Sequence, residues 1–421
     1  MKEHYQVIVV GGGTAGVIAA IQAGRAGART LLIERNGILG GTMTAAGVIC
    51  VSSFHAYEKQ VIAGIGWELF CRTREICGEV HPSEFKPGSS GATYPKVNGA
   101  VFSLVASDAI VDAGVDLLLH AMPAAVHRES DGWTVTVCTK TGLREITADV
   151  LVDCSADANL VSLAGFPVVK PETMQPATLV MAFTGYEPDD LDYAVIQSAF
   201  DAEVAAGRLC AADVGWSQGK IEPLLRNRGG NAIHVLNVDG TTSEGRTHAE
   251  TEGRRVLLRL FRFLRTQPGL DKLCIASTAM ETGIRETVTI HGRATISLDD
   301  YISGKMWDDA VCYSFYPIDL HLPQGLDFRI IPPGIFPTIP LGAMLPEGSQ
   351  CLVVAGRCIA GDRLANSAYR VMATCFATGQ AAGAVAALAS ARGVDTADVP
   401  LDDLRSLLRS HGAIVPPDAL A

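Results

Sequence analysis

The sequence lacks several features that would place it in common classes of protein. Its 11 cysteines form no C-x-x-C pair and no paired spacing of the kind that zinc sites use, so we expect no metal centre. No stretch of about 18 uninterrupted apolar residues occurs, so we predict no membrane span. No basic run is present, and a net charge of −11 argues against nucleic acid as a partner.

The distribution of cysteine indicates a reducing compartment. The number of cysteines is odd, and several of them, such as Cys312 and Cys351, lie in apolar runs, which is typical of buried reduced thiols. The first apolar run begins within the first ten residues and leaves no room for a signal peptide. We therefore expect a cytoplasmic protein.

Length and composition favour an α/β enzyme with two domains. A chain of 421 residues is too long for one ordinary core. Its 48% hydrophobic content fits a soluble protein, and its 43 glycines indicate backbone held close to a ligand.

The strongest motif lies at residues 6–34, where an apolar run, glycines, an Ala-rich segment, a second apolar run and an acid follow in order. Gly11, Gly13 and Gly16 have the G-x-G-x-x-G spacing, and Glu34 lies at the expected distance beyond them. The first helical turn, which includes Thr14 and Ala15, would present free N–H groups to a pyrophosphate. Glu34 would accept hydrogen bonds from the ribose. A simple tight turn is the alternative, but the whole register favours a dinucleotide site.

The segment after the acid separates flavin from nicotinamide. Arg35 leads without a break to Gly40, Gly41 and Thr42. Here the chain resembles the FAD-dependent oxidoreductases of the glutathione-reductase-like superfamily, with distant fumarate reductase and succinate dehydrogenase flavoprotein relatives. In that superfamily a Gly-Gly-small segment passes the pyrophosphate and flavin. The resemblance therefore implies FAD as the cofactor.

The resemblance implies further FAD contacts along the chain. A strand at 115–120 and short strands at 124–128, 133–139 and 143–147 match the third parallel strand and β-meander of the superfamily, and a strand at 150–153 returns to the parallel sheet. Backbone near Val126 would contact adenine. The remaining cofactor candidates are Ala156 and Asp157 in a small-residue turn, Gly356 and Arg357 at the last strand end, Met372 in the segment before a small-residue helix, and Gly379, Gln380 and Ala381 within that helix.

These segments together predict an α/β fold. We expect a Rossmann-like FAD-binding domain, with a parallel sheet plus β-meander, and an inserted α+β substrate domain. The expected boundaries are 1–164 and 341–421 for the two parts of the FAD-binding domain and 165–340 for the insert. Helices are predicted at 65–76, 100–113, 189–205 and 250–265, and a strand at 178–185.

Two polar motifs in the insert supply catalytic candidates. Arg285 in an Arg-Glu-Thr segment and Asp319 and His321 in a Tyr-Pro-x-Asp-x-His segment resemble one bacterial branch of FAD-dependent oxidoreductases. Arg285 offers a charged fork for a substrate carboxylate or for a flavin anion, and Glu286 could hold that fork in place or take protons. Asp319 and His321 share a face if extended, and an acid beside an imidazole can move protons. Pairs that merely tie the domains together remain an alternative.

His55 and Tyr94 are the weaker candidates. Both lie in or beside irregular segments that could face a flavin, and a structural role for each is the alternative. Covalent attachment of flavin through His55 or Cys50 stays open.

The leading functional hypothesis is an FAD-dependent dehydrogenase or oxidase that moves hydride between flavin N5 and a small organic substrate, polar or carboxylated. An ene-reductase of the fumarate-reductase type, fed by a separate donor, and a non-redox flavin-dependent lyase or isomerase are the alternatives. No second glycine motif and no redox cysteine pair after Gly41 occur, which argues against an NAD(P)H domain and against disulfide reduction. The electron partner (oxygen, a quinone or an electron-transfer protein), homo-oligomerisation and the identity of the substrate stay open.

Overall fold

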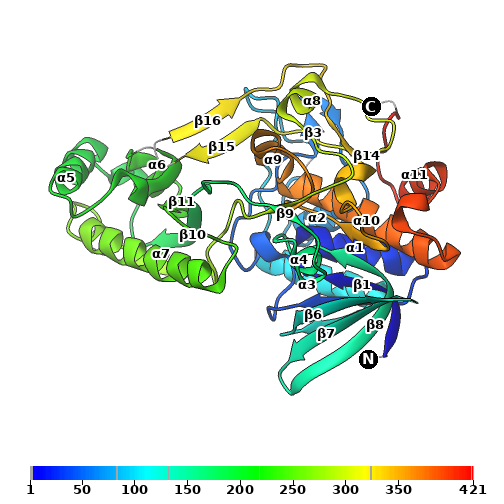
Figure 1. Cartoon of the computed structure of the whole chain (residues 1–421). Coiled ribbons are helices and arrows are strands. Elements are labelled where there is room, and N and C mark those ends of the chain that lie inside the picture. The colour runs from blue at the N-terminus through cyan, green and yellow to red at the C-terminus, as the bar shows by residue number, and fades with distance from the viewer. Residues whose placement is uncertain are drawn as a thin grey trace.

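A computed structural model describes residues 3–81, 84–130, 132–217, 219–322, 325–418 and 420. It confirms the mixed α/β fold with a Rossmann-like unit. The buried apolar residues form two cores, and Figure 1 shows the helices and strands that carry them. The larger core draws on residues from Tyr5 to Val161 and from Val288 to Val415, and the smaller core on residues from Ala177 to Ile284.

A seven-stranded sheet carries the larger core, in the order β5-β2-β1-β8-β7-β6 with β18 beside β8. The strands are β1 (His4–Val10), β2 (Thr30–Glu34), β5 (Asp116–Leu119), β6 (Met122–Glu129), β7 (Gly132–Thr139), β8 (Gly142–Asp153) and β18 (Leu352–Val354). Strands β5, β2, β1, β8 and β18 run parallel, and β6, β7 and β8 form the antiparallel meander. The predicted third parallel strand and meander are confirmed.

Strand β8 differs from the prediction. The sequence suggests two short strands, 143–147 and 150–153, whereas the structure has one strand of 12 residues. Its first part pairs with β7 as far as Ala148, and its later part pairs with β1 and β18. No glycine or proline lies between the two predicted strands, so nothing in the backbone interrupts the extended conformation.

Helices enclose this sheet, and two of them lie in direct backbone contact. The helices of the larger core are α1 (Thr14–Arg25), α2 (Ile65–Ile76), α3 (Gly99–Asp112), α4 (Asn159–Leu163), α8 (Leu298–Ser303), α9 (Arg363–Tyr369), α10 (Met372–Arg392) and α11 (Leu401–Ser410). A Cβ atom on Gly379 of α10 would lie 2.2 Å from the Ala15 carbonyl oxygen of α1, and one on Gly383 would lie 2.2 Å from that of Ala19. Only glycine allows the two helices to approach this closely.

Helix α10 is long and apolar enough to cross a membrane by length and composition alone. However, 94% of its most apolar window is buried inside the protein, against α1, α2 and α11. An all-round apolar helix of this kind is typical of a protein core.

The smaller core is an α+β unit, seen at the left of Figure 1. Its antiparallel sheet has the order β11-β10-β12. Its elements are β10 (Ala177–Thr184), β11 (Gly229–Val235), β12 (Cys274–Thr278), α5 (Tyr193–Ala205), α6 (Glu222–Arg226) and α7 (Ser243–Leu264). The helix predicted at 189–205 starts later, because Pro188–Asp190 forms a 3₁₀ turn and the Asp192 side chain caps α5. The helix predicted at 250–265 starts earlier, where Thr242 caps α7.

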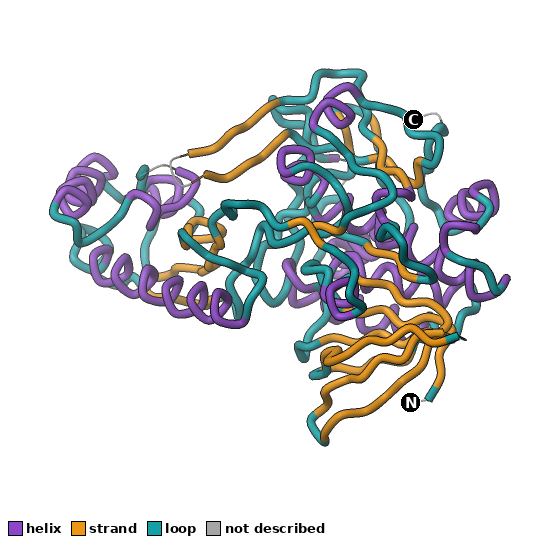
Figure 2. The backbone as a smooth tube through the Cα atoms, viewed as in Figure 1, coloured by secondary structure: helices purple, strands orange, loops and turns teal. Residues whose placement is uncertain are grey.

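Short strand pairs lie between and beside the two cores. They are β3 (His55–Ala56) with β4 (Lys59–Gln60), β9 (Val168–Val169) with β13 (Thr289–Ile290), β14 (Ala310–Tyr313) with β17 (Thr338–Pro340), and β15 (Ile318–Leu322) with β16 (Gly325–Arg329). Figure 2 shows the β15–β16 hairpin extending from the larger body toward the smaller one. Apolar residues from Val288 to Leu345 pack in the larger core, so the smaller core is narrower than the predicted 165–340 insert.

We expect Gly379→Ala to destabilise the larger core, because its Cβ would collide with the backbone of α1. Overpacking of this kind costs about 1–3 kcal/mol. Thermal unfolding, followed together with the amount of FAD retained, measures the effect. Ala391→Val, which adds methyl groups at an exposed position of the same helix, is the control. Equal melting temperatures for the two variants would show that a Cβ at position 379 does not collide with the backbone of α1.

Candidate active site

The turn between β1 and α1 accepts only glycine at two of its positions. Gly11 has φ +98°, and a Cβ there would lie 2.4 Å from the Cys154 carbonyl oxygen. A Cβ on Gly16 would lie 1.7 Å from the Gly11 carbonyl oxygen. At Gly13 the nearest atom is the Cα of Gly41, at 3.9 Å, so space for a ligand remains in front of the helix. This cradle fits the pyrophosphate of a dinucleotide, as the spacing predicts.

The acid at the end of β2 is held by this turn. Gly12 N donates to Glu34 Oε2 at 2.6 Å, and Asn36 N donates to Glu34 Oε1 at 2.7 Å. Burial raises the pKa of Glu34 in spite of these bonds. Because a carboxylate has about four acceptor positions, Glu34 keeps capacity for the hydroxyl groups of a ribose.

The second glycine segment lies directly on the first. Gly40 N donates to Gly12 O at 2.8 Å, and Gly13 and Gly40 form a parallel bridge. Gly41 has φ +52°, and a Cβ there would meet the Cα of Gly13 at 2.8 Å. Thr42, the next residue, is exposed. The backbone of the glycine turn thus contacts the backbone of Gly40 and Gly41, which are distant in sequence, as the resemblance implies.

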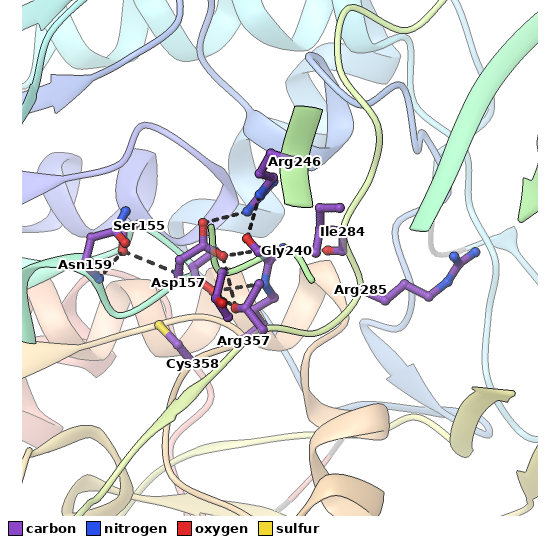
Figure 3. A network of polar contacts seen from close by, with 12 residues as sticks. Ser155, Asp157, Asn159, Gly240, Arg246, Ile284, Arg285, Arg357 and Cys358 are labelled. Atoms are coloured by element: carbon purple, nitrogen blue, oxygen red, sulfur yellow. Dashed lines mark hydrogen bonds and ion pairs between the residues drawn. The ribbon is translucent and has the colours of Figure 1, made fainter. Parts of the chain in front are cut away.

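The third segment completes the cradle through an ion network (Figure 3). Gly356 has φ +87°, and a Cβ at this position would lie 3.3 Å from the Cβ of Ala15. Arg357 donates to Asp157 Oδ1 at 2.6 Å and to the Ala156 carbonyl at 2.9 Å. Arg246, from α7, donates to the other carboxylate oxygen of Asp157 at 2.7 Å.

Two guanidinium groups share the single carboxylate of Asp157. Burial alone would raise the pKa of Asp157, but the charges of Arg357 and Arg246 outweigh it and lower that pKa. These two guanidinium groups and this carboxylate together carry one positive charge in excess. This excess complements the negative charge of a dinucleotide.

Three predicted cofactor residues take part in helix packing. Gly379 packs on Ala15, and the Gln380 side chain bonds Ile65 N, Gln22 and the His411 carbonyl. Ala381 is fully buried in the same part of α10. These residues lie two turns beyond the start of α10, and their contact with the flavin stays a prediction.

Other cofactor candidates lie near the expected places. Met372 is the first residue of α10, but the amide of Ala373 already donates to Ser52 O at 3.2 Å. Arg35 forms an ion pair with Glu281 beside the smaller core. Val126 is buried in β6, and Ala121, just before that strand, donates to Glu34 O at 3.1 Å. The adenine contact near Val126 stays a prediction.

A second polar cluster lies between the two cores and contains three of the catalytic candidates. Arg285 is 8% exposed and donates to Pro176 O at 2.7 Å and to Asn231 Oδ1 at 3.3 Å. His321 Nε2 lies 3.5 Å from Asp319 Oδ2. Arg370, directly after α9, donates to the carbonyls of Asp319 at 3.2 Å and Arg285 at 3.4 Å. The predicted residues Arg285, Asp319 and His321 thus come together, and Arg370 joins them.

The cluster and the FAD cradle meet at one point of the chain. Arg357 of the cradle donates to Ile284 O at 2.7 Å, and Arg370 of the cluster contacts the carbonyl of the next residue, Arg285. In Figure 3 the side chain of Arg285 points away from the Asp157 network. The backbone at 284–285 therefore separates cofactor contacts from the polar cluster.

The electrostatics of the cluster follow from burial. Burial lowers the pKa of His321 to about 4, helped by the charge of Arg285 and opposed by Asp319. Burial likewise lowers the pKa of His234, whose ring lies 5.2 Å from that of His321, to about 2. Both imidazoles are neutral near pH 7. Burial would raise the pKa of Asp319, but His321, Arg370 and Arg285 lower it, so this carboxylate stays ionised.

The remaining candidates differ in their relation to the cluster. The ring of Tyr94 lies 6.1 Å from that of Tyr316, at the side of Asp319, and Tyr94 is 42% exposed. His55 lies instead edge-on to Trp67, at 5.6 Å, in the β3–β4 hairpin. Cys50 contacts Ser52 at 3.7 Å. The structure therefore brings Tyr94, but not His55, to the cluster.

Glu286 does not hold Arg285. It bonds Arg363 through both oxygens, at 2.8 and 3.0 Å, and accepts from Gln175 N at 2.8 Å. Glu286 thus ties the segment before β10 to α9. This is a structural role, which the sequence left open as the alternative to a role in the site.

Sequence reasoning missed Gln175, His234 and Arg370. The Oε1 atom of Gln175 accepts from His321 N and from Arg370, each at 3.1 Å. Only Arg370 gave a signal in the sequence. It is a charged residue two positions before Met372, the start of a long segment without charged residues. In the sequence, His234 lies within an apolar segment and cannot be distinguished from an ordinary core residue.

The fold and the cradle define a dinucleotide-binding protein of the α/β class. Over residues 6–408 the chain matches the FAD dependent oxidoreductase family, and it belongs to that family. FAD is therefore its cofactor, and the protein is an enzyme.

Two curated relatives match the chain in part. Thioredoxin reductase of Bacillus subtilis (strain 168) is 29% identical over 137 residues, which are 32% of this chain and 42% of the relative. Mitochondrial dihydrolipoyl dehydrogenase of Dictyostelium discoideum is 38% identical over 61 residues, 14% of this chain and 12% of the relative. The chain thus spans less than half the length of either relative.

A solved structure, that of a geranylgeranyl bacteriochlorophyll reductase-like protein from Thermoplasma acidophilum, is similar at 14% identity and a TM-score of 0.45. The match covers 97% of this chain and 83% of that one. A likeness at this level carries no information about the reaction.

We expect acid to destabilise the protein through the two buried imidazoles. Their folded pKa values, about 4 for His321 and about 2 for His234, lie below the unfolded value near 6.5, so the unfolded state binds more protons below that pH. Each histidine then removes about 1.4 kcal/mol per pH unit between roughly pH 6.5 and its folded pKa.

Melting temperatures between pH 7 and pH 5 measure this effect. His234→Gln and His321→Gln should each lose less stability on acidification than the parent protein. His291→Gln serves as the control, because His291 is half-exposed and pairs with Glu347. Identical pH slopes for all four proteins would show that these imidazoles are not kept neutral by burial.

Proposed function

We propose that the protein is an FAD-dependent dehydrogenase or oxidase of a small organic substrate, polar or carboxylated. The observation that supports this is the cluster of a buried arginine and a carboxylate-bound imidazole, joined to the FAD cradle through Ile284 and Arg285. FAD bound in that cradle supplies a hydride acceptor or donor at N5. The cytoplasm is the proposed location, and oxygen, a quinone or an electron-transfer protein is the proposed electron partner.

His321 is the proposed base. Its Nε2 faces Asp319, which is ionised and therefore favours a proton on that nitrogen. The lone pair then lies on Nδ1, which is buried and has no partner in the described part of the chain. With a pKa near 4 this nitrogen is deprotonated at neutral pH. As the substrate loses hydride to the flavin, it loses its O–H or N–H proton to His321 Nδ1.

Arg285 is the proposed orienting group. Its guanidinium is anchored by Pro176 O and Asn231 Oδ1, so its direction is set before the substrate arrives. Tyr94, half-exposed and beside Tyr316, is the proposed contact on the solvent side.

We expect Arg285→Ala and His321→Ala each to lower kcat/KM at least tenfold, which is about 1.4 kcal/mol of transition-state stabilisation. The substrate is found first, by anaerobic screening of small polar and carboxylated compounds for bleaching of the flavin. The acid limb of the kcat/KM profile should lie well below pH 6.5, because burial lowers the pKa of His321 to about 4.

Arg329→Ala and His291→Ala are matched controls, since both residues are about half-exposed and lie outside the cluster. Losses below tenfold in the cluster variants would overturn the assigned roles. If no compound bleaches the flavin, and an enoate rapidly oxidises the chemically reduced flavin, the protein is the ene-reductase. Turnover without any spectral change would point to a non-redox reaction.

A further inference from the structure

Buried polar atoms without a partner gather at one place in this protein. Within the described residues these atoms are Gln175 Nε2, His234 Nε2, His321 Nδ1 and Arg370 Nε. Gln175, His234 and His321 are 2%, 6% and 9% exposed. All four residues belong to the polar cluster between the two cores. A buried polar group without a partner keeps its full desolvation penalty, so the concentration of such groups here indicates a site that a polar ligand completes.

The charges of the cluster do not balance. Arg285 and Arg370 each carry a positive charge, and the described residues place no carboxylate within ion-pair distance of either guanidinium. Among the residues that the structure describes, Asp319 is the acid whose charge acts on both guanidinium groups. The neighbouring Glu286 is already neutralised by Arg363, and both histidines are neutral. The charges of Arg285, Arg370 and Asp319 therefore leave one buried positive charge without a compensating negative charge.

We propose that this cluster selects a substrate bearing one carboxylate, held by Arg285 and Arg370 together, with Gln175 and His234 as specificity-determining residues. This deepens the proposed function, on which it rests, because it names the class of substrate. A single negative charge brings the sum of charges to zero, whereas a neutral ligand leaves the excess and a dianion reverses it. A carboxylate also fits the fork of a guanidinium with its two oxygens.

The first test uses redox-inert probes on the FAD-loaded protein. Propionate, propionamide and malonate are similar in size and carry charges of −1, 0 and −2. Their binding is followed by the flavin difference spectrum and by the shift in melting temperature at pH 7. Propionate should bind at least tenfold more tightly than either of the others. Equal affinity for propionamide, or tighter binding of malonate, would overturn the proposal.

The second test uses variants and pH. Arg370→Gln should weaken propionate binding at least tenfold, Arg370→Lys should weaken it less, and the exposed control Arg329→Gln should leave it unchanged. Burial lowers the pKa of Arg285, helped by the charge of Arg370 and opposed by that of Asp319, but a guanidinium stays protonated in proteins. His321 and His234 also face Arg285 and are neutral there. In the parent protein, propionate binding should therefore stay constant from pH 7 to pH 9, and a loss of binding over that range would contradict a carboxylate held by two arginines.

The two proposals fail in different ways. If a substrate bleaches the flavin but propionate neither binds nor competes with it, the monocarboxylate site is wrong and the redox function stands. If propionate binds as expected and no monocarboxylate bleaches the flavin, the site stands and the direction or type of reaction is wrong.

Discussion

Direct contact between backbones is the constraint on which the rest of this structure depends. Gly16 lies against Gly11, Gly41 against Gly13 and Gly379 against Ala15, and a side chain at any of these glycines would collide. Helix α1 is thereby held between the strand ends and α10. The first N–H groups of α1 have no partner within the helix, so they can donate hydrogen bonds to a pyrophosphate. The cofactor cradle is thus a consequence of packing as much as of the residues that touch the ligand.

The polar groups around the cradle are shared between the two cores. Asp157 from the larger core binds Arg246 from α7, Arg35 pairs with Glu281, and the ring of His234 in β11 lies edge-on to that of His321 in β15. The substrate-side cluster exists only where these elements meet. Its buried charge is tolerable because it is complemented from both sides, by Asp319 at one end and, as proposed, by a ligand at the other.

The sequence predicts the cradle well because glycine spacing reports backbone geometry directly. Gly11, Gly41 and Gly356 all lie where the motif requires. The same reasoning is ambiguous for Gly379, because a small residue that lets a helix approach a ligand looks identical in sequence to one that lets it approach another helix, as Gly379 does at Ala15. Gln175 and His234 could not be found, since their signal is a missing partner, which exists only in three dimensions. The pairing of Glu286 with Arg363 likewise joins residues 77 positions apart.

The parallel sheet also has a temporal consequence during synthesis. Strand β18 and helix α10 close the larger core, yet they follow β8 by about 200 residues, whereas the smaller core is contiguous from Ala177 to Ile284. On the ribosome the smaller unit can therefore fold while the nucleotide-binding half still exposes the face that α10 will cover. The chain would therefore bind FAD only after α10 has been synthesised. Until then the apolar face of the sheet stays exposed, and it is the surface most in need of a chaperone.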